Sequence, residues 1–181
     1  MTITWEVPGR LRLDITGKAA LVFDDVTGPN SGKGAFSADD VSLMESLVDD
    51  SAETFLYGTT QGVQASLLGG NFRTDDGKNK KYTGPWYSLY ETYQKSESRP
   101  GNPYLRKRFY FDSQTRYLWR VAYPGASGAT VTTDFTQWKV VNGQAYPGRI
   151  TRTDGTSNVF QIDITTATFG ASAADSLFPG H

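Results

Sequence analysis

The first residues of the chain alternate between apolar and polar side chains, as a strand does when one of its faces is buried. In "RLRLDITG", the leucines and the isoleucine fall on one side, and Arg10, Arg12 and Asp14 fall on the other. Gly17 ends this stretch, and "KAALVFDD" follows as a second short strand. The next segment, "VTGPNSGKGAF", is rich in Gly, Pro and Asn, so we predict a loop there.

The period of the apolar positions changes at Ser37, which is a suitable N-cap because two aspartates follow it in the first turn. Ser51 is a suitable cap for a second stretch. We predict one broken helix or two short helices that run to about Gln61. The segment "GVQASLLGG" either continues the helix or begins a strand. The apolar positions at helical spacing are Val41, Met44, Leu47 and Val48, followed by Phe55 and Leu56.

From Tyr82 onward the pattern returns to strands. "WYSLYETYQ" is followed by a polar loop and then by five apolar segments with a turn signal between each pair. Short connections of this kind join antiparallel neighbours, so we predict a five-strand meander. No repeat or linker interrupts the chain, and we predict a single domain over residues 1–181. The five segments are "RKRFYFD", "RYLWRVAY", "ATVTTDFTQWKVV", "QAYPGRITRT" and "NVFQIDITTATF".

Two turn dipeptides, Asn142-Gly143 and Asp154-Gly155, allow the faces of the last strands to be assigned. If each closes a hairpin, the residues that face each other across the turn can be paired, and their side chains lie on the same face of the sheet. We expect the first of the two resulting faces to point inward and the second to be semi-exposed. The slip in parity between Phe135 and Trp138 indicates a β-bulge. The first face holds Trp138, Val140, Ala145, Pro147, Phe160, Ile162 and Ile164; the second holds Val131, Thr133, Phe135, Tyr146, Ile150, Gln161 and Asp163.

Arg149 is the exception on the predicted inward face, because its neighbours there are apolar. A guanidinium in such a place is costly unless it has a partner, which would be an acid, a group of carbonyls or a ligand. In the simplest interpretation its aliphatic part packs against the sheet while the charge reaches the solvent at the edge. Contact with an anionic ligand is the functional alternative.

The composition of the chain argues against several classes of function. The chain has 181 residues, 18 basic and 19 acidic side chains and a formal charge of -1, so no basic surface for nucleic acid is expected. It has no Cys, which excludes disulfides and thiol catalysis. No apolar run approaches the roughly 20 residues of a transmembrane helix. The opening residues alternate as a strand and contain no apolar leader core, so we expect a leader to be absent from this chain.

Residues that perform catalysis are scarce in the sequence. The single His is the last residue, His181, which argues against a His-based triad or metal site. "GPNSGKG" lacks the spacing of a phosphate-binding loop. Four Asp-Asp pairs fall at element ends or turns, where Asp serves as a cap, and we interpret them as structural. We therefore predict a protein that is not an enzyme and uses no cofactor or metal. The aromatic segments "LYETYQ" and "YLWRVAY" are typical of cross-strand pairs.

The order of elements resembles the outer-membrane lipoprotein carriers, the LolA/LolB-like proteins, and a group of uncharacterised bacterial envelope proteins near them. The resemblance implies an α+β fold: a strongly curved antiparallel sheet, or incomplete β-barrel, with a helical insertion packed on its concave face. In the carriers an arginine ties the helices to the barrel; Arg12, Arg73, Arg108 and Arg149 are all candidates here. The resembling segments are "VPGRLRLDITG", "SLMESLVDDSAETFLYG", "SLLGGNFRTDD", "YTGPWYSLYE", "RKRFYFDSQTRYLWRVAY", "FTQWKVVNGQAYPGRITRTDG" and "ADSLFPG".

The resemblance and the aromatic-rich sheet together predict a periplasmic or otherwise extracytoplasmic protein that binds a lipid or lipoprotein acyl chain between sheet and helices. The alternative is an envelope protein-interaction or sensor domain with a filled core, which would use the face of Phe135, Tyr146 and Ile150. Hydrolysis by paired aspartates is a third and weaker hypothesis. The predicted ligand-binding residues are Trp138, Val140, Phe160, Ile162, Arg149, Met44 and Phe55.

Overall fold

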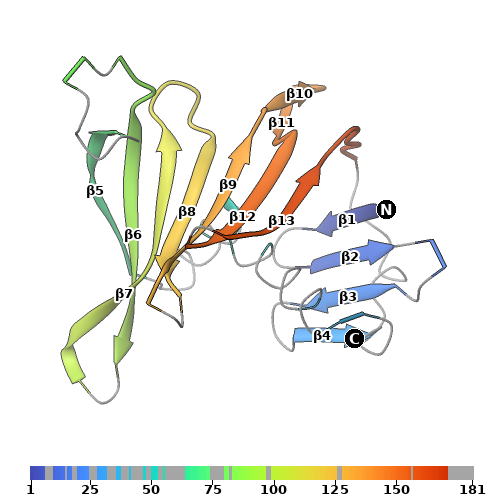
Figure 1. Ribbon diagram of the computed structural model, residues 1–181, viewed down its shortest axis with the longest axis horizontal. Helices are drawn as coiled ribbons and strands as arrows, with labels where there is room; N and C mark the ends of the chain where they lie inside the picture. The colour runs from blue at the N-terminus through green and yellow to red at the C-terminus, as the bar shows by residue number, and fades with distance from the viewer. Residues whose placement is uncertain are drawn as a thin grey trace. The chain divides into compact units, whose positions relative to one another are not determined.

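The computed structural model is built from antiparallel strands (Figure 1). It describes residues 1–6, 10–14, 16–17, 20–24, 28–31, 36–37, 41, 47, 50–52, 55, 64–73, 80–81, 83–96, 99–125, 128–155 and 157–170. The chain forms two compact units, Met1–Gln61 with Gly170–His181 and Gly62–Phe169, which are taken separately below. The prediction of one domain over residues 1–181 stays a prediction.

The first unit contains a four-stranded sheet in the order β1-β2-β3-β4. Its strands are β1 (Thr2–Glu6), β2 (Arg10–Asp14), β3 (Leu21–Asp24) and β4 (Gly28–Ser31). Leu13 and Leu21 are paired across β2 and β3 and both are buried, as the alternation predicted. The predicted loop was partly wrong, because "GPNS" forms β4 and pairs with β3. A strand with Gly and Pro is tolerated there because β4 is the edge of the sheet.

The predicted helices lie mostly outside the described residues. The amide of Val41 donates to the carbonyl of Ser37 at 3.1 Å, and the amide of Phe55 donates to the carbonyl of Ser51 at 3.2 Å. Val41, Leu47, Ala52 and Phe55 are helical, as predicted, and most of the residues between them lie outside the described part of the chain. Of the predicted ligand-binding residues in this segment, Phe55 is half-buried, and Met44 lies outside the described residues.

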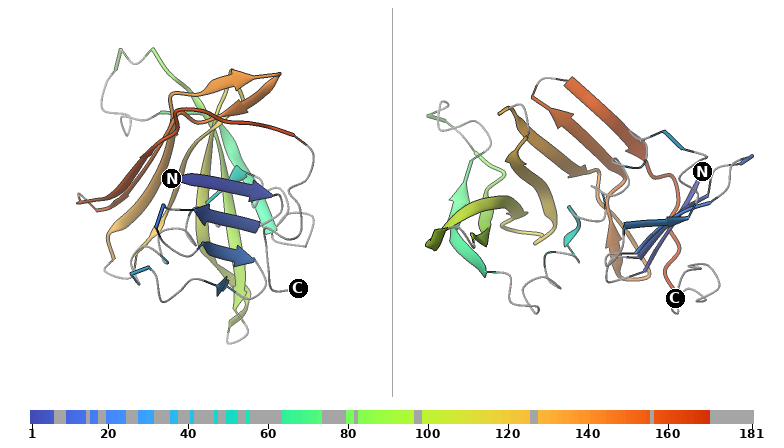
Figure 2. Two further views of the ribbon diagram at one scale, coloured as in Figure 1. Left: turned by 90° about the vertical axis from the view of Figure 1, so that its right-hand side faces the viewer. Right: turned by 90° about the horizontal axis from the view of Figure 1, so that it is seen from below.

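The second unit contains a seven-stranded sheet in the order β13-β12-β9-β8-β7-β6-β5. Figure 2 shows this sheet bending while its end strands stay apart, so it is open. Between β9 and β12 in the sequence, strands β10 and β11 form a separate two-stranded sheet. The strands are β5 (Gln64–Phe72), β6 (Tyr87–Ser96), β7 (Arg99–Asp112), β8 (Leu118–Pro124), β9 (Thr130–Thr136), β10 (Lys139–Val141), β11 (Gln144–Tyr146), β12 (Arg149–Asp154) and β13 (Ser157–Asp163).

The predicted α+β fold with helices on a concave sheet is wrong for the described chain, which is all-β with open sheets. Part of the error lies in a segment whose short apolar pattern fits a helix or a strand equally well, so that a neighbouring strand decides which of the two forms. The segment "QASLLGG", for which helix and strand were both open, instead forms β5 and bonds to β6.

Candidate functional site

One face of the seven-stranded sheet is buried, and we call it the buried face. Strand register places its side chains in neighbouring positions: Ile150 of β12 lies opposite both Phe135 of β9 and Ile162 of β13. Val121 of β8 lies in the same way between Phe109 of β7 and Thr133 of β9. The members of the buried face are between 0% and 9% exposed: Phe109, Val121, Val131, Thr133, Phe135, Ile150 and Ile162.

The predicted inward face was wrong for β9, β10 and β12, whereas Ile162 of β13 is buried as predicted. Phe135 and Ile150 belong to the face predicted to be semi-exposed, yet both are buried, whereas Val140 from the predicted inward face is 58% exposed. The cause is the β10-β11 hairpin, which pairs only with itself and lets β12 return directly beside β9. Counting alternate residues through this hairpin therefore does not show which side chains share a face in the large sheet. The pairing of Val141 with Gln144 was itself predicted and is confirmed.

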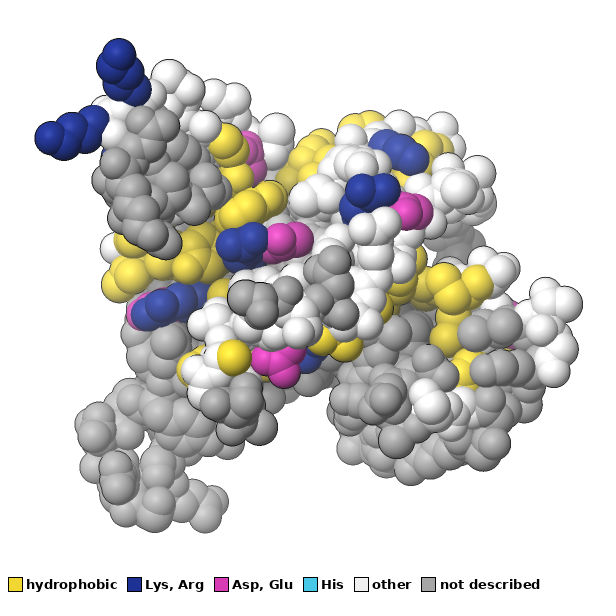
Figure 3. Space-filling view, in the orientation of Figure 1, with side chains coloured by type: hydrophobic (Ala, Val, Ile, Leu, Met, Phe, Trp, Pro, Cys, Tyr) yellow, Lys and Arg dark blue, Asp and Glu magenta, His cyan; other side chains and the backbone are white. Residues whose placement is uncertain are grey.

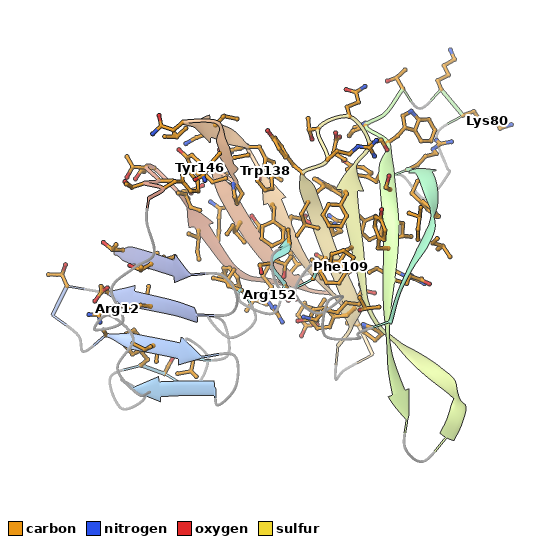
Figure 4. All side chains as sticks on the ribbon, turned by 180° about the vertical axis from the view of Figure 1, so that it is seen from behind. Arg12, Lys80, Phe109, Trp138, Tyr146 and Arg152 are labelled. Atoms are coloured by element: carbon orange, nitrogen blue, oxygen red, sulfur yellow. The ribbon has the colours of Figure 1, made fainter. Side chains whose placement is uncertain are left out.

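The predicted ligand-binding residues of this unit do not converge on one site. Trp138 stacks on Tyr117 with ring centroids 4.7 Å apart, and its indole N–H donates to the carbonyl of Phe135 at 3.0 Å. Figure 4 shows Trp138 and Tyr146 beside the β10-β11 hairpin. Val140 lies exposed on that hairpin, whereas Ile162 is buried in the large sheet. Phe160 lies half-buried on β13, opposite Arg152.

Arg149 is paired with an acid, one of the partners that the sequence left open. Its Nε donates to Oδ1 of Asp163 at 2.6 Å, directly across from it on β13. Gln161 donates to the other oxygen of Asp163 at 2.8 Å. Hydrogen bonds from Arg149 and Gln161 lower the pKa of Asp163. Arg149 alternates with buried Ile150 along β12, so it lies on the opposite face, which is polar over β12 and apolar over β6, where Leu89 is buried.

The arginine that lies on the buried face is Arg152. It donates to the hydroxyl of Tyr123, and its guanidinium carbon lies 5.5 Å from the centroid of that ring. The ammonium of Lys107 lies 5.2 Å from the same centroid. Arg152 is set between Thr133 and Phe160 by the strand register. The sequence placed Arg149 on an apolar face, but the arginine on that face is Arg152. The two faces of β12 were assigned the wrong way round.

The opposite face carries cross-strand ion pairs, and we call it the ion-pair face. Among the described residues, three ion pairs each join two adjacent strands, and Figure 3 shows basic and acidic side chains together over this sheet. Threonines lie between them, and the hydroxyls of Thr132 and Thr153 are 2.6 Å apart. The pairs are Glu91 with Arg108 at 2.8 Å, Arg120 with Asp134 at 2.5 Å, and Arg149 with Asp163 at 2.6 Å.

Arg120 on the ion-pair face contacts both an acidic and an aromatic side chain. It makes two bonds to Asp134, and its guanidinium lies 4.2 Å from the centroid of Trp119, which also stacks on Tyr87 at 4.4 Å. A bulge between β7 and β8 brings Trp119 beside Arg120. Burial lowers the pKa of Arg120, but the hydrogen bonds and charge of Asp134, together with Tyr110 and Tyr87, outweigh it, so the net pKa is raised. These contacts fit a structural role, since each group already has a partner.

Strand β5 forms one edge of the large sheet, and no strand in the described part of the chain pairs with its outer side. Its sequence, "QASLLGGNF", has no ionisable side chain. Leu67 is 58% exposed and Leu68 is 52% exposed. Sequence reasoning missed this feature because the segment was open between helix and strand. The absence of charged residues beside two adjacent leucines was the signal in the sequence that could have indicated this edge.

Comparison with known proteins identifies no relative. No family model, no curated protein and no solved structure matches this chain. The resemblance to lipoprotein carriers, the extracytoplasmic location and the absence of catalysis therefore stay predictions. Among the described residues, no group of three or more His, Asp or Glu side chains is placed to hold a metal ion. No helix within that part of the chain is long and apolar enough to cross a membrane.

Proposed function

We propose that the unit Gly62–Phe169 is a non-enzymatic protein-interaction module that accepts an extended polypeptide strand at the edge of β5. The observation that supports this proposal is the combination at β5 of an edge position, an uncharged sequence and two leucines that are more than half exposed. Soluble proteins usually protect such an edge with charge, proline, a β-bulge or a covering segment, because it is a template for strand pairing. Strand β5 has no charge or proline, but its ladder with β6 shifts between Leu67 and Gly69 and between Gly69 and Phe72.

Strand addition suits this edge chemically. The backbone N–H and C=O groups on the outer side of an edge strand can form a ladder with an incoming strand, which supplies affinity that depends little on sequence. Leu67 and Leu68 would supply the side-chain contacts, because burial of exposed apolar area favours association. The occupant is therefore an extended segment with apolar side chains next to the two leucines.

The buried face argues for a filled core. Val121 and Thr133 are 0% exposed, and the rest of the buried face is no more than 9% exposed. Side chains that are this little exposed offer hardly any apolar surface to an acyl chain. This favours an interaction module over the lipid-binding hypothesis, which stays a prediction. Phe135, Tyr146 and Ile150 are buried as well, which supports an interaction surface elsewhere on this unit.

Fluorescence anisotropy with labelled ten-residue peptides tests the proposal. The panel contains extended sequences with alternating apolar and polar positions, including a copy of β6. We expect binding to the wild-type protein and a loss of about tenfold or more for Leu68→Lys, because a lysine on an edge opposes strand addition. Val159→Lys is the matched control, since Val159 is 54% exposed on β13 at the other edge.

The same panel can reject the proposal. Absence of binding up to about 1 mM peptide would exclude a useful recognition edge at β5. Equal binding by wild-type protein and Leu68→Lys would place recognition elsewhere. Circular dichroism of each variant serves as a check that the lysine leaves the sheet intact, which we expect because the leucine is more than half exposed.

A further inference from the structure

We propose that Asn142 is a site of spontaneous covalent modification, at which the side-chain amide is lost and the residue becomes a mixture of aspartate and isoaspartate. Asn142 and Gly143 form the turn between β10 and β11. Among the asparagines of the sequence, only Asn142 is followed by Gly. The inference concerns this hairpin and is independent of strand addition at β5.

The reaction needs only the chain itself and water. The backbone nitrogen of Gly143 attacks Cγ of Asn142, and a bond forms between these two atoms. The bond from Cγ to Nδ2 breaks, and ammonia leaves with the proton of the Gly143 amide. Water then opens the five-membered succinimide ring at either of its carbonyls, which gives aspartate or isoaspartate. Asparagine is among the thermolabile residues for this reason.

The turn leaves the attacking nitrogen accessible. Asn142 and Gly143 are both exposed, and their φ angles are 52° and 80°, as in a type I′ turn. Within the described part of the chain, the amide of Gly143 donates to no carbonyl. A Cβ atom at Gly143 would meet nothing within 4 Å, so there is space beside this nitrogen for the ring to close.

The turn at Asp154-Gly155 provides a comparison in the same protein. Asp154 is exposed as Asn142 is, but the amide of Gly155 donates to the carbonyl of Thr130 at 3.0 Å. A Cβ atom at Gly155 would lie 3.3 Å from Cβ of Ala129. Ring closure there would break the hydrogen bond and crowd the neighbouring chain. The two turns therefore differ in whether the backbone nitrogen can react.

We expect the structural effect of the modification to stay within the hairpin. Strands β10 and β11 form a sheet of their own, so the ladder between β9 and β12 does not run through them. The aspartate product keeps the turn, because Asp-Gly also suits a type I′ turn. The isoaspartate product adds a methylene group to the main chain, which disturbs the pairing of Val141 with Gln144. Both products make the formal charge of -1 more negative by one unit.

Peptide mapping of the full chain after incubation in mildly alkaline buffer tests the proposal. Trypsin releases residues 140–149, "VVNGQAYPGR", in which Asn142 is the only Asn. We expect this peptide to convert to two products of equal mass, the aspartate and isoaspartate forms, with a carboxyl in place of the amide. The rate in the folded protein should lie within about tenfold of the rate in the same chain unfolded in guanidinium chloride. An Asn142 that stays intact in the folded protein while the unfolded chain converts would overturn the proposal.

The variant Asp154→Asn provides the matched control, because it places the same dipeptide in the turn whose amide is held. In the folded variant we expect conversion at position 154 to be slower than at Asn142 by about tenfold or more. In the unfolded variant the two rates should be similar. Equal rates at both positions in the folded variant would overturn the assignment of reactivity to the free Gly143 amide. Circular dichroism serves as a check that the variant is folded, and the comparison of folded with unfolded wild type stands without it.

Discussion

Replacing a valine by alanine at two positions tests the buried face most directly. Val131 on β9 is 5% exposed, and Val140 on β10 is 58% exposed. The substitution is the same at both, so the difference in the free energy of unfolding reports burial alone. The two positions also separate the structure from the sequence pattern, which placed Val140 on the inward face and Val131 on the other.

The expected magnitudes follow from the exposed fractions. Val131→Ala removes the equivalent of two buried methylene groups, at about 0.8 kcal/mol each, and leaves a small cavity. We expect a loss of about 2–3 kcal/mol in the free energy of unfolding. Val140→Ala removes side-chain atoms that are mostly in water, and we expect a change within about 0.5 kcal/mol.

Chemical denaturation followed by tryptophan fluorescence measures both variants. Three of the four tryptophans, Trp86, Trp119 and Trp138, belong to the unit Gly62–Phe169, so the signal reports mainly on that unit. The slope of the free energy with denaturant should be equal for wild type and variants, so that midpoints can be compared. A loss for Val140→Ala as large as that for Val131→Ala would refute the assigned buried face.

Three further predictions concern single contacts of the large sheet. Burial raises the pKa of Asp112, but the hydrogen bonds from the β7–β8 turn and the charge of Arg116 together outweigh it, so its net pKa is lowered. Its contribution to stability is then present above the unfolded pKa of about 3.9 and is lost as pH falls through the lower folded pKa. Asp112→Asn should cost about 1 kcal/mol at pH 7 in thermal unfolding, a difference that shrinks at acidic pH; a constant difference would contradict this. Gly148→Ala should cost about 1–3 kcal/mol in urea unfolding, because its Cβ would lie 2.6 Å from the carbonyl oxygen of Gln137; a neutral result would mean that the backbone moves easily there. Arg120→Met should cost about 1–2 kcal/mol, because it leaves a half-buried carboxylate without its bidentate partner, whereas Arg149→Met, at a more exposed pair, should stay within about 1 kcal/mol; equal losses in calorimetry would refute the distinction.

Most strands could be predicted from the sequence because their signals are local. Alternation in "RLRLD", the turn at Asn142-Gly143 and the segments after Tyr82 depend on residues that are neighbours along the chain. The structure has strands at all of these places, including β2 and the β10-β11 hairpin, which has the predicted pairing. Strand β5 was left open because two leucines and two glycines fit either period.

The functional features depended on contacts between residues that are distant in the sequence. Whether Ile150 or Val140 is buried is decided by the return of β12 beside β9, which no local turn specifies. The same pairing assigns Arg149 to the ion-pair face and Arg152 to the buried face. A strand has two equivalent faces until a second strand and a core select one, so a single change of neighbour inverts every assignment along it. The sequence alone determined where the strands lie, and the tertiary structure decided which of their faces is buried and which edge is left for a partner.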